Sequence, residues 1–215
     1  MKRRITMRNY SIILIISWFA TLLVAKSQDN ESAYSAYQNG NYERAIELYS
    51  AQIKINQEYA PIFYNRGLAY MRMENFPAAI ADLNKAVQLD KQNADAYYTL
   101  AIAHTKMGDY SKAIDNANQA TEINPNNAQF AYAKANIYYM MEDDDNSIAA
   151  YNRVIELDNN NAMAYYGRAV AYKYKNQNKL ATEDFNKFLQ FSGQAQLYVD
   201  EANRMLQVIE NQENE

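Results

Sequence analysis

The feature that most constrains this chain is a pattern that recurs at a constant interval along most of its length. Within the segment 94–127, apolar and aromatic residues follow the i, i+3, i+4, i+7 spacing of one helix face, at Tyr97, Leu100, Ala101 and His104. Gly108 and Asp109 then indicate a turn, because glycine reaches backbone angles that other residues avoid. A second helix should follow and end before Pro125, which lacks a backbone donor, with an inward face formed by Ala113, Ala117 and Ala120.

A shift by this interval brings four further segments into register, one of them more loosely: 60–93, 128–161, 162–195 and the degenerate 26–59. A helix–turn–helix period of about 34 residues with this pattern resembles the tetratricopeptide repeat (TPR) family. The resemblance implies an all-α fold, an α-solenoid of antiparallel helix–turn–helix repeats. It also implies that a protein or peptide partner binds in a groove on the concave side. It covers nearly all of the chain beyond Ser27, with five repeats over 28–193.

One turn departs from the repeat pattern. The acidic run Glu142, Asp143, Asp144 and Asp145 stands where the segment 94–127 has Gly108 and Asp109. A calcium-binding EF-hand loop requires a glycine at its sixth position and a glutamate at its twelfth, and no frame here supplies both. We therefore expect these acids to lie at a helix N-terminus, where the helix dipole favours negative charge.

The segment that follows the last repeat predicts a capping helix. Residues 194–210 are amphipathic, with apolar residues grouped at helical spacing at Leu197, Ala202, Met205, Leu206 and Ile209. A solenoid needs such a helix, since the last repeat otherwise exposes the face that a neighbour would cover. Within this terminal region, 194–215, we expect residues 211–215 to fray.

The N-terminal segment 1–27 is of a different kind. A basic start precedes the apolar run 12–25, and Ala25 and Ser27 suit the small-residue pattern of a cleavage site. This pattern is typical of a secretory signal peptide, and the run is short for a membrane span of about 20 residues. An uncleaved N-terminal anchor formed by residues 11–25 is the alternative. Both predict an exported location, whether periplasm, envelope or secreted, with membrane contact only through this segment.

Charge and cysteine content exclude several classes of function. Five of the 21 Lys and Arg residues lie in the segment 1–27, and none of the 25 Asp and Glu residues does. The rest of the chain therefore carries a net charge of −9, which disfavours nucleic acid as a partner. The chain has no cysteine, so disulfides, thiolate catalysis and cysteine zinc sites are excluded.

No pattern in the sequence points to catalysis, a metal or a cofactor. The single histidine, His104, occupies the repeat position that holds Tyr70, Tyr138 and Tyr172 elsewhere, so we interpret it as a packed residue. General acid–base catalysis would need a positioned partner, and a metal would need further ligands. The five glycines are scattered and form no phosphate-binding loop. We expect a protein without enzymatic activity.

The candidate binding surface follows from the resemblance, which implies that the first helix of each repeat lines the groove. The residues that would face the groove are Tyr64, Leu68, Met71, Arg72, Asp95, Tyr98, Ile102, Lys106, Tyr132, Asn136, Tyr139, Tyr166, Val170, Lys173 and Tyr174. Tyrosine offers a large rigid surface with a polar tip, which suits peptide recognition. Packing between helices explains the same tyrosines equally well. Two other functions stay open: a glycan-binding module that uses these tyrosines, and a self-associating structural component.

Some TPR proteins grip a C-terminal carboxylate with a lysine one turn before an asparagine on a first helix. In this chain Asn136 occupies the asparagine position, but Tyr132 stands where the lysine should be. We therefore do not expect that clamp.

Overall fold

The computed structural model describes residues 32–193 and 196–213. The predicted signal peptide, 1–27, and the anchor alternative, 11–25, lie outside the described residues. Within them the chain forms helices and no strands. The helices are α2 (Ala33–Gln38), α3 (Tyr42–Ile55), α4 (Ala60–Arg72), α5 (Phe76–Leu89), α6 (Ala94–Lys106), α7 (Tyr110–Ile123), α8 (Ala128–Met140), α9 (Asp144–Leu157), α10 (Ala162–Tyr174), α11 (Asn178–Phe191) and α12 (Gln196–Glu213).

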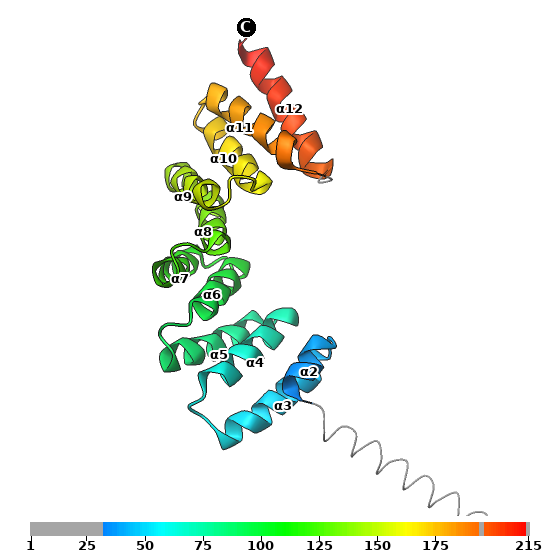
Figure 1. Cartoon of the computed structure of the whole chain (residues 1–215), viewed down its shortest axis with the longest axis vertical. Coiled ribbons are helices and arrows are strands. Elements are labelled where there is room, and N and C mark those ends of the chain that lie inside the picture. The colour runs from blue at the N-terminus through cyan, green and yellow to red at the C-terminus, as the bar shows by residue number, and fades with distance from the viewer. Residues whose placement is uncertain (1–31, 194–195, 214–215) are drawn as a thin grey trace, which may run out of the picture.

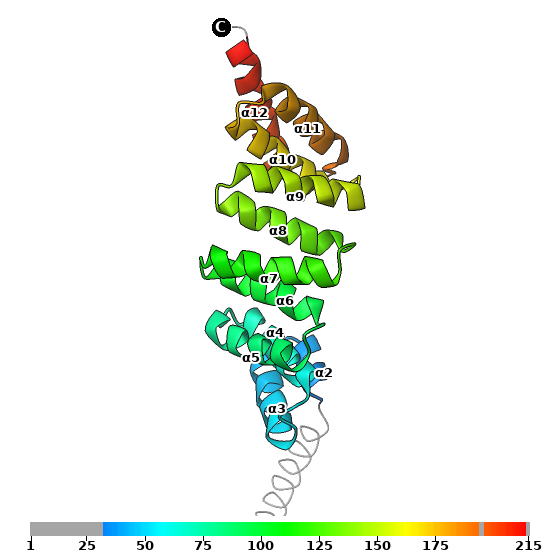
Figure 2. The same cartoon turned by 90° about the vertical axis from the view of Figure 1, so that its left-hand side faces the viewer.

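The helices stack into a curved solenoid, which confirms the predicted all-α architecture (Figure 1). Each helix packs on the next one along the chain, and the first helices α4, α6, α8 and α10 also contact one another across repeats. Contact between first helices shortens that side, so it is the concave one. Turning the molecule brings the convex side into view, where α7 and α9 lie (Figure 2). None of the described helices is both long enough and apolar enough to cross a membrane.

The turns inside four of the repeats use the same local chemistry at the same repeat position, whereas Gln177 in the last repeat makes no such side-chain cap. The side chains of Asn41, Asn75, Asp109 and Asp143 each accept a backbone N–H at the start of the second helix. Such a cap satisfies one of the donors that a helix start leaves unpaired. Asp144 and Asp145 fall in the first turn of α9, so the expected placement of the acidic run at a helix N-terminus is confirmed.

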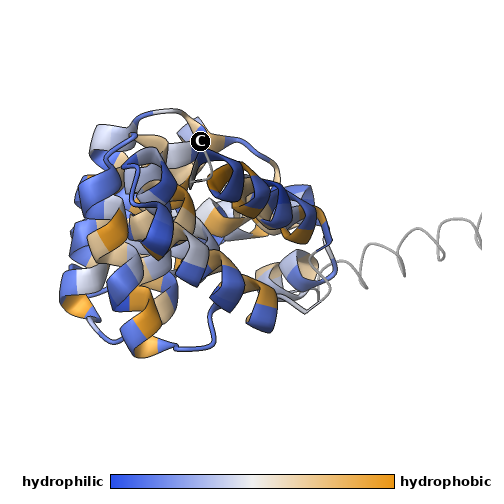
Figure 3. Cartoon of the chain, turned by 90° about the horizontal axis from the view of Figure 1, so that it is seen from above, coloured by the Kyte–Doolittle hydropathy of each residue, from blue (hydrophilic) through white to orange (hydrophobic). Residues whose placement is uncertain are grey.

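Core residues are small where the two helices of a repeat cross. A Cβ atom added to Gly67 would lie 2.9 Å from Leu83 Cγ and 3.5 Å from the carbonyl oxygen of Ala79. The two helices of this repeat therefore approach each other closely at Gly67 and Ala79. Seen along the long axis, most of the loop segments are hydrophilic, whereas hydrophobic and hydrophilic residues alternate along the helices (Figure 3). This alternation is the expected pattern of amphipathic helices that bury one face.

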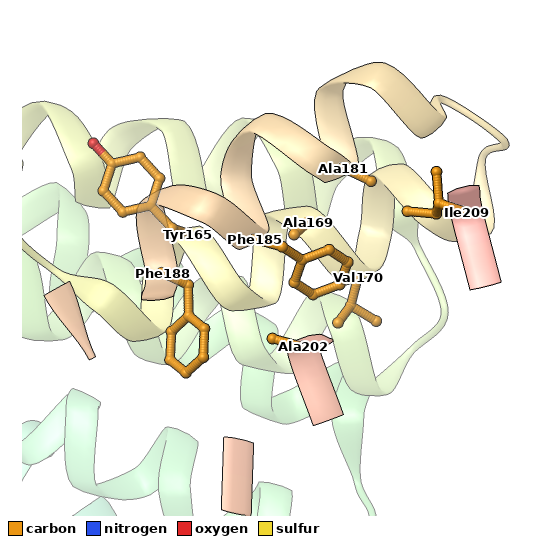
Figure 4. Close-up of a cluster of buried hydrophobic side chains, with 8 residues drawn as sticks. All are labelled: Tyr165, Ala169, Val170, Ala181, Phe185, Phe188, Ala202 and Ile209. Carbon is orange, nitrogen blue, oxygen red and sulfur yellow. The ribbon is translucent and has the colours of Figure 1, made fainter. Parts of the chain in front are cut away.

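The capping helix α12 packs on the last repeat and completes the largest described core cluster (Figure 4). Ala202 and Ile209 are buried against Val170 of α10 and the phenylalanines of α11. Two details of the prediction are wrong. Leu197 is 75% exposed, because it lies on the side of α12 that faces away from this cluster. The helix also continues to Glu213, beyond the predicted end at residue 210.

Candidate functional site

A cavity of about 540 Å³ opens between the first helices α6, α8 and α10 and the start of α12. It therefore lies on the concave side, towards the C-terminal end of the solenoid. Its walls are formed by Tyr98, Ile102, Thr105, Gln129, Tyr132, Ala133, Asn136, Ile137, Tyr139, Met140, Tyr151, Met163, Tyr166, Gly167, Val170 and Tyr198.

Seven of the fifteen predicted groove residues line this cavity: Tyr98, Ile102, Tyr132, Asn136, Tyr139, Tyr166 and Val170. The structure places the other eight outside it: Tyr64, Leu68, Met71, Arg72, Asp95, Lys106, Lys173 and Tyr174. Some of these eight have internal partners. Lys173 Nζ donates to Gln212 Oε1 of α12 at 2.6 Å, and Arg72 Nε donates to the Tyr37 hydroxyl at 3.2 Å.

Three tyrosines at the same repeat position both pack and line the cavity. Tyr98 stacks on Phe130 with ring centroids 5.0 Å apart. Tyr132 lies 6.1 Å from the ring of Tyr151. Tyr166 makes edge-to-face contacts with Phe188 and with Tyr198, at 5.1 and 5.3 Å. Packing thus fixes one side of each ring, so these aromatic walls are rigid.

The cavity carries no charge of its own. None of its lining residues is acidic or basic. Burial raises the pKa of Tyr166 to about 12, and it also raises the pKa of Tyr98 and of Tyr132. These hydroxyls are therefore neutral at physiological pH and can donate or accept hydrogen bonds. The arrangement favours an apolar group that is flanked by a few neutral hydrogen-bonding groups.

One wall of the cavity comes from a second helix, which the sequence reasoning missed. Tyr151 of α9 reaches across the space beside Gly167 and donates to Asn136 Oδ1 at 2.6 Å. A Cβ atom at Gly167 would lie 2.3 Å from Tyr151 Cζ, so only glycine admits this ring. A signal was present in the sequence. The other repeats have Tyr49, Leu83, Ala117 or Phe185 at the position of Tyr151, but only Tyr151 is followed by a repeat with a glycine, Gly167, where others have Asn65, Thr99 or Ala133.

Most of the remaining missed residues occupy repeat positions that the groove prediction used in other repeats. Gln129 and Met163 stand at the position of Asp95, and Met140 stands at that of Lys106. Tyr198 belongs to α12, which the sequence presented only as a cap. Gln129 Nε2 donates to the Tyr98 hydroxyl at 2.9 Å and so couples neighbouring repeats. The others are Thr105, Ala133, Ile137, Met140 and Met163.

His104 lies outside this cavity and is packed in the core, as predicted. It is 8% exposed, and its Nδ1 atom lies 3.8 Å from a carboxylate oxygen of Asp109, the cap of α7. That distance is too long for a hydrogen bond. Burial lowers the pKa of His104, although the nearby carboxylate acts in the opposite direction. Across residues 32–193 and 196–213, no group of three acidic or histidine side chains is placed to hold a metal.

Two family models match the sequence. One, described as "Tetratricopeptide repeat", matches residues 70–137, and the other, described as "TPR repeat", matches residues 33–74 and 135–176. Together the matches extend over residues 33–176, which is more than half of the chain. No curated protein matches the sequence.

Solved structures of TPR proteins superpose on the chain. A crystal structure of MamA is 27% identical, with a TM-score of 0.73, and covers 75% of this chain and 95% of its own. YrrB, described as a TPR protein with an unusual peptide-binding site, is 22% identical, with a TM-score of 0.71 and coverages of 80% and 88%. MamA from Desulfovibrio magneticus RS-1 is 19% identical, with a TM-score of 0.72 and coverages of 78% and 94%.

The repeat period, the stacked helix pairs, the family models and the structural neighbours all agree. The chain belongs to the tetratricopeptide repeat family.

Proposed function

We propose that this protein is a scaffold that binds an uncharged, hydrophobic segment of a partner protein in the cavity between α6, α8, α10 and α12. TPR repeats generally mediate protein or peptide binding, and proteins of this family are generally non-enzymatic. The observation that carries the proposal is the cavity itself, which combines rigid tyrosine walls with a complete lack of charged lining residues.

The cavity chemistry favours a peptide over a glycan. Sugar sites combine flat aromatic faces with free amides and carboxylates, and no carboxylate lines this cavity. Its two amide side chains are engaged with tyrosine hydroxyls, Gln129 with Tyr98 and Asn136 with Tyr151. An apolar side chain of a partner would instead bury its surface against the rings, a gain of about 25 cal/mol per Å². Backbone amides beside it would meet the neutral hydroxyls.

We further propose that this binding takes place outside the cytosol. The basic start, the apolar run 12–25 and the small residues after it support export. Partners should therefore be sought among exported or envelope proteins.

A charge placed inside the cavity tests the proposal. Ala133 of α8 lines the cavity, and a glutamate there would introduce a buried charge and fill part of the volume. Ala81→Glu is the matched control, because Ala81 is exposed on the second helix α5 and does not line the cavity. Residues 28–215 of the parent and of both variants, each checked for helicity by circular dichroism, would be used to capture proteins from the envelope fraction of the native cells.

The segment of each captured protein that binds would then be made as a synthetic peptide. Fluorescence anisotropy would measure the affinity of this peptide for the parent and for both variants. We expect the parent and Ala81→Glu to bind alike and the folded Ala133→Glu variant to bind at least about tenfold more weakly. Equal binding by Ala133→Glu would show that the cavity is not the binding site. If the captured protein is only a second copy of this chain, the result would favour the self-associating alternative.

A further inference from the structure

Two repeats are joined to the preceding repeats by the same kind of clamp, in which a partly buried arginine binds a buried aspartate. Arg66 donates to both carboxylate oxygens of Asp82 at 2.7 Å and to the Ser50 hydroxyl at 2.8 Å. Arg168 lies three repeat lengths further along the chain and makes the equivalent bonds at 2.6 to 2.7 Å, to Asp184 and Asn152. In both clamps, an arginine from a first helix binds a carboxylate of the following helix and a polar group of the preceding repeat.

The repeat 128–161 keeps the cation of this clamp but lacks its carboxylate. Lys134 of α8 stands at the position of Arg66 and Arg168, and Ala150 of α9 stands where they have Asp82 and Asp184. The repeat 94–127 differs, since its equivalent residue is the fully buried Leu100. Lys134 is partly buried, and within the described part of the chain it has no hydrogen-bonding or ion-pair partner.

A cavity of about 300 Å³ occupies the place of the missing carboxylate. It lies between α7, α8 and α9, on the side of α8 opposite the concave cavity, with which it shares no residue. Its walls are formed by Thr121, Pro125, Ala131, Lys134, Tyr138, Asn146, Ala149, Ala150 and Arg153. Ala150, which stands where the other two repeats have an aspartate, therefore borders this open space.

The charge on these walls is positive. Arg153 is held against the cavity because it donates to the Pro125 carbonyl and to Asn126 Oδ1, both at 3.1 Å, while Glu156 pairs with its other nitrogen. Asp143, just before α9, is already used, since it caps α9 and accepts from Asn146 Nδ2. Lys134 is left as a cation without a counter-charge beside an empty space.

We propose that this cavity is a second binding site, which takes the carboxylate of a glutamate or aspartate side chain from a protein partner. That carboxylate would complete in trans the clamp that Asp82 and Asp184 complete internally. Lys134 would supply the charge, and the Tyr138 hydroxyl and Arg153 would bound the site. This inference concerns the opposite face of the solenoid and does not depend on the proposed function.

A small-molecule probe and an internal replacement test the site. Propionate reproduces the end of a glutamate side chain, and propionamide is its uncharged counterpart. Each would be titrated into the full chain in mild detergent at constant ionic strength. Nuclear magnetic resonance would follow the signals of Lys134, Asn146 and Ala150. We expect propionate to shift these signals saturably and propionamide to leave them unchanged.

Two variants locate the effect. Lys134→Met keeps the side-chain length without the charge, and we expect it to weaken propionate binding about tenfold or more. Ala150→Asp supplies the carboxylate from within the chain, so we expect it to abolish propionate binding and to raise the melting temperature. Asp82 and Asp184 show the kind of ion pair that this variant would form.

The proposal is overturned by either of two results. Propionate shifts that match those of chloride at the same ionic strength would show no carboxylate site. Unchanged propionate binding in the folded Ala150→Asp variant would show that the probe binds elsewhere. A peptide that binds the concave cavity should lose affinity for the Ala133→Glu variant but not for Lys134→Met. This difference would show that the two sites are distinct.

Discussion

At Gly167, a missing side chain in one repeat makes room for a tyrosine of the preceding repeat. The Tyr151 ring occupies the space that a Cβ atom at Gly167 would need, and its hydroxyl bonds to Asn136. This contact joins α9, the second helix of its repeat, to the first helices α8 and α10 on either side of it. The absence of a Cβ atom at Gly167 therefore allows Tyr151 to form one wall of the concave cavity.

We predict that Gly167→Ala destabilises the protein by about 1–3 kcal/mol, because the added methyl group overpacks against a buried ring. Urea denaturation would measure the change. The matched control is Gly67→Ala, whose closest contact, 2.9 Å, is with the flexible side chain of Leu83. We expect a smaller loss there, since the gain in helix propensity of about 1 kcal/mol offsets more of it. Equal losses at both glycines would contradict this account, whereas recovery on adding Tyr151→Leu to Gly167→Ala would support it.

His104 should make the free energy of unfolding depend on pH near neutrality. Burial lowers its pKa in the folded state from the ordinary value of 6.5. The unfolded chain then binds this proton more readily, so the free energy of unfolding falls as the pH drops below that value and is fully retained above it. Asp109 does not interfere, because its pKa is lowered from 3.8 and its contribution is lost only at more acidic pH.

The test is His104→Tyr, which installs the residue that the equivalent positions of three other repeats carry. We expect the melting temperature of the parent to fall between about pH 7.5 and about pH 5, and that of the variant to change less. Identical pH profiles for the two proteins would assign the dependence to other groups.

At the scale of an element, α12 has two roles. It buries the last core cluster with Ala202 and Ile209, and it also places Tyr198 against Tyr166 at the edge of the concave cavity. Lys173 is tied to it through Gln212. The cap is thus part of the candidate site.

We predict that removal of residues 194–215 lowers the melting temperature by more than about 5 °C, because the deletion exposes Phe185 and Phe188 of α11. The truncated chain should also self-associate more through this face, which light scattering would detect. Tyr198→Ala is the companion variant, which should weaken partner binding with little effect on melting. A truncated chain that melts like the parent would contradict a capping role.

At the scale of the molecule, the solenoid is a series of local contacts between neighbours. Its core consists of separate clusters along the stack, each shared by adjacent helices. The stability of such a chain is approximately a sum over repeats and their interfaces. Each arginine clamp therefore stabilises only its own repeat interface. The clamps of Arg66 and Arg168 are complete, whereas the one at Lys134 lacks its carboxylate.

The sequence by itself determined the alternation of helices and turns, the helix N-terminus at the acidic run 142–145 and the packed position of His104. These features depend on residues within one repeat, where a helical period and a turn residue specify the local structure. It also supplied the central tyrosines of the candidate site, since Tyr98, Tyr132 and Tyr166 occupy one repeated position.

The tertiary structure alone decided which part of the predicted face becomes a cavity. Tyr64 and Arg72 on α4 lie outside it, while Tyr151 and Tyr198 enter it from a second helix and the cap. The physical reason is that a cavity depends on side-chain volumes that meet between different repeats and on where the last helix docks. A pattern that repeats within the chain carries the fold, whereas the exceptions to that pattern, Gly167 and Ala150 among them, shape the sites.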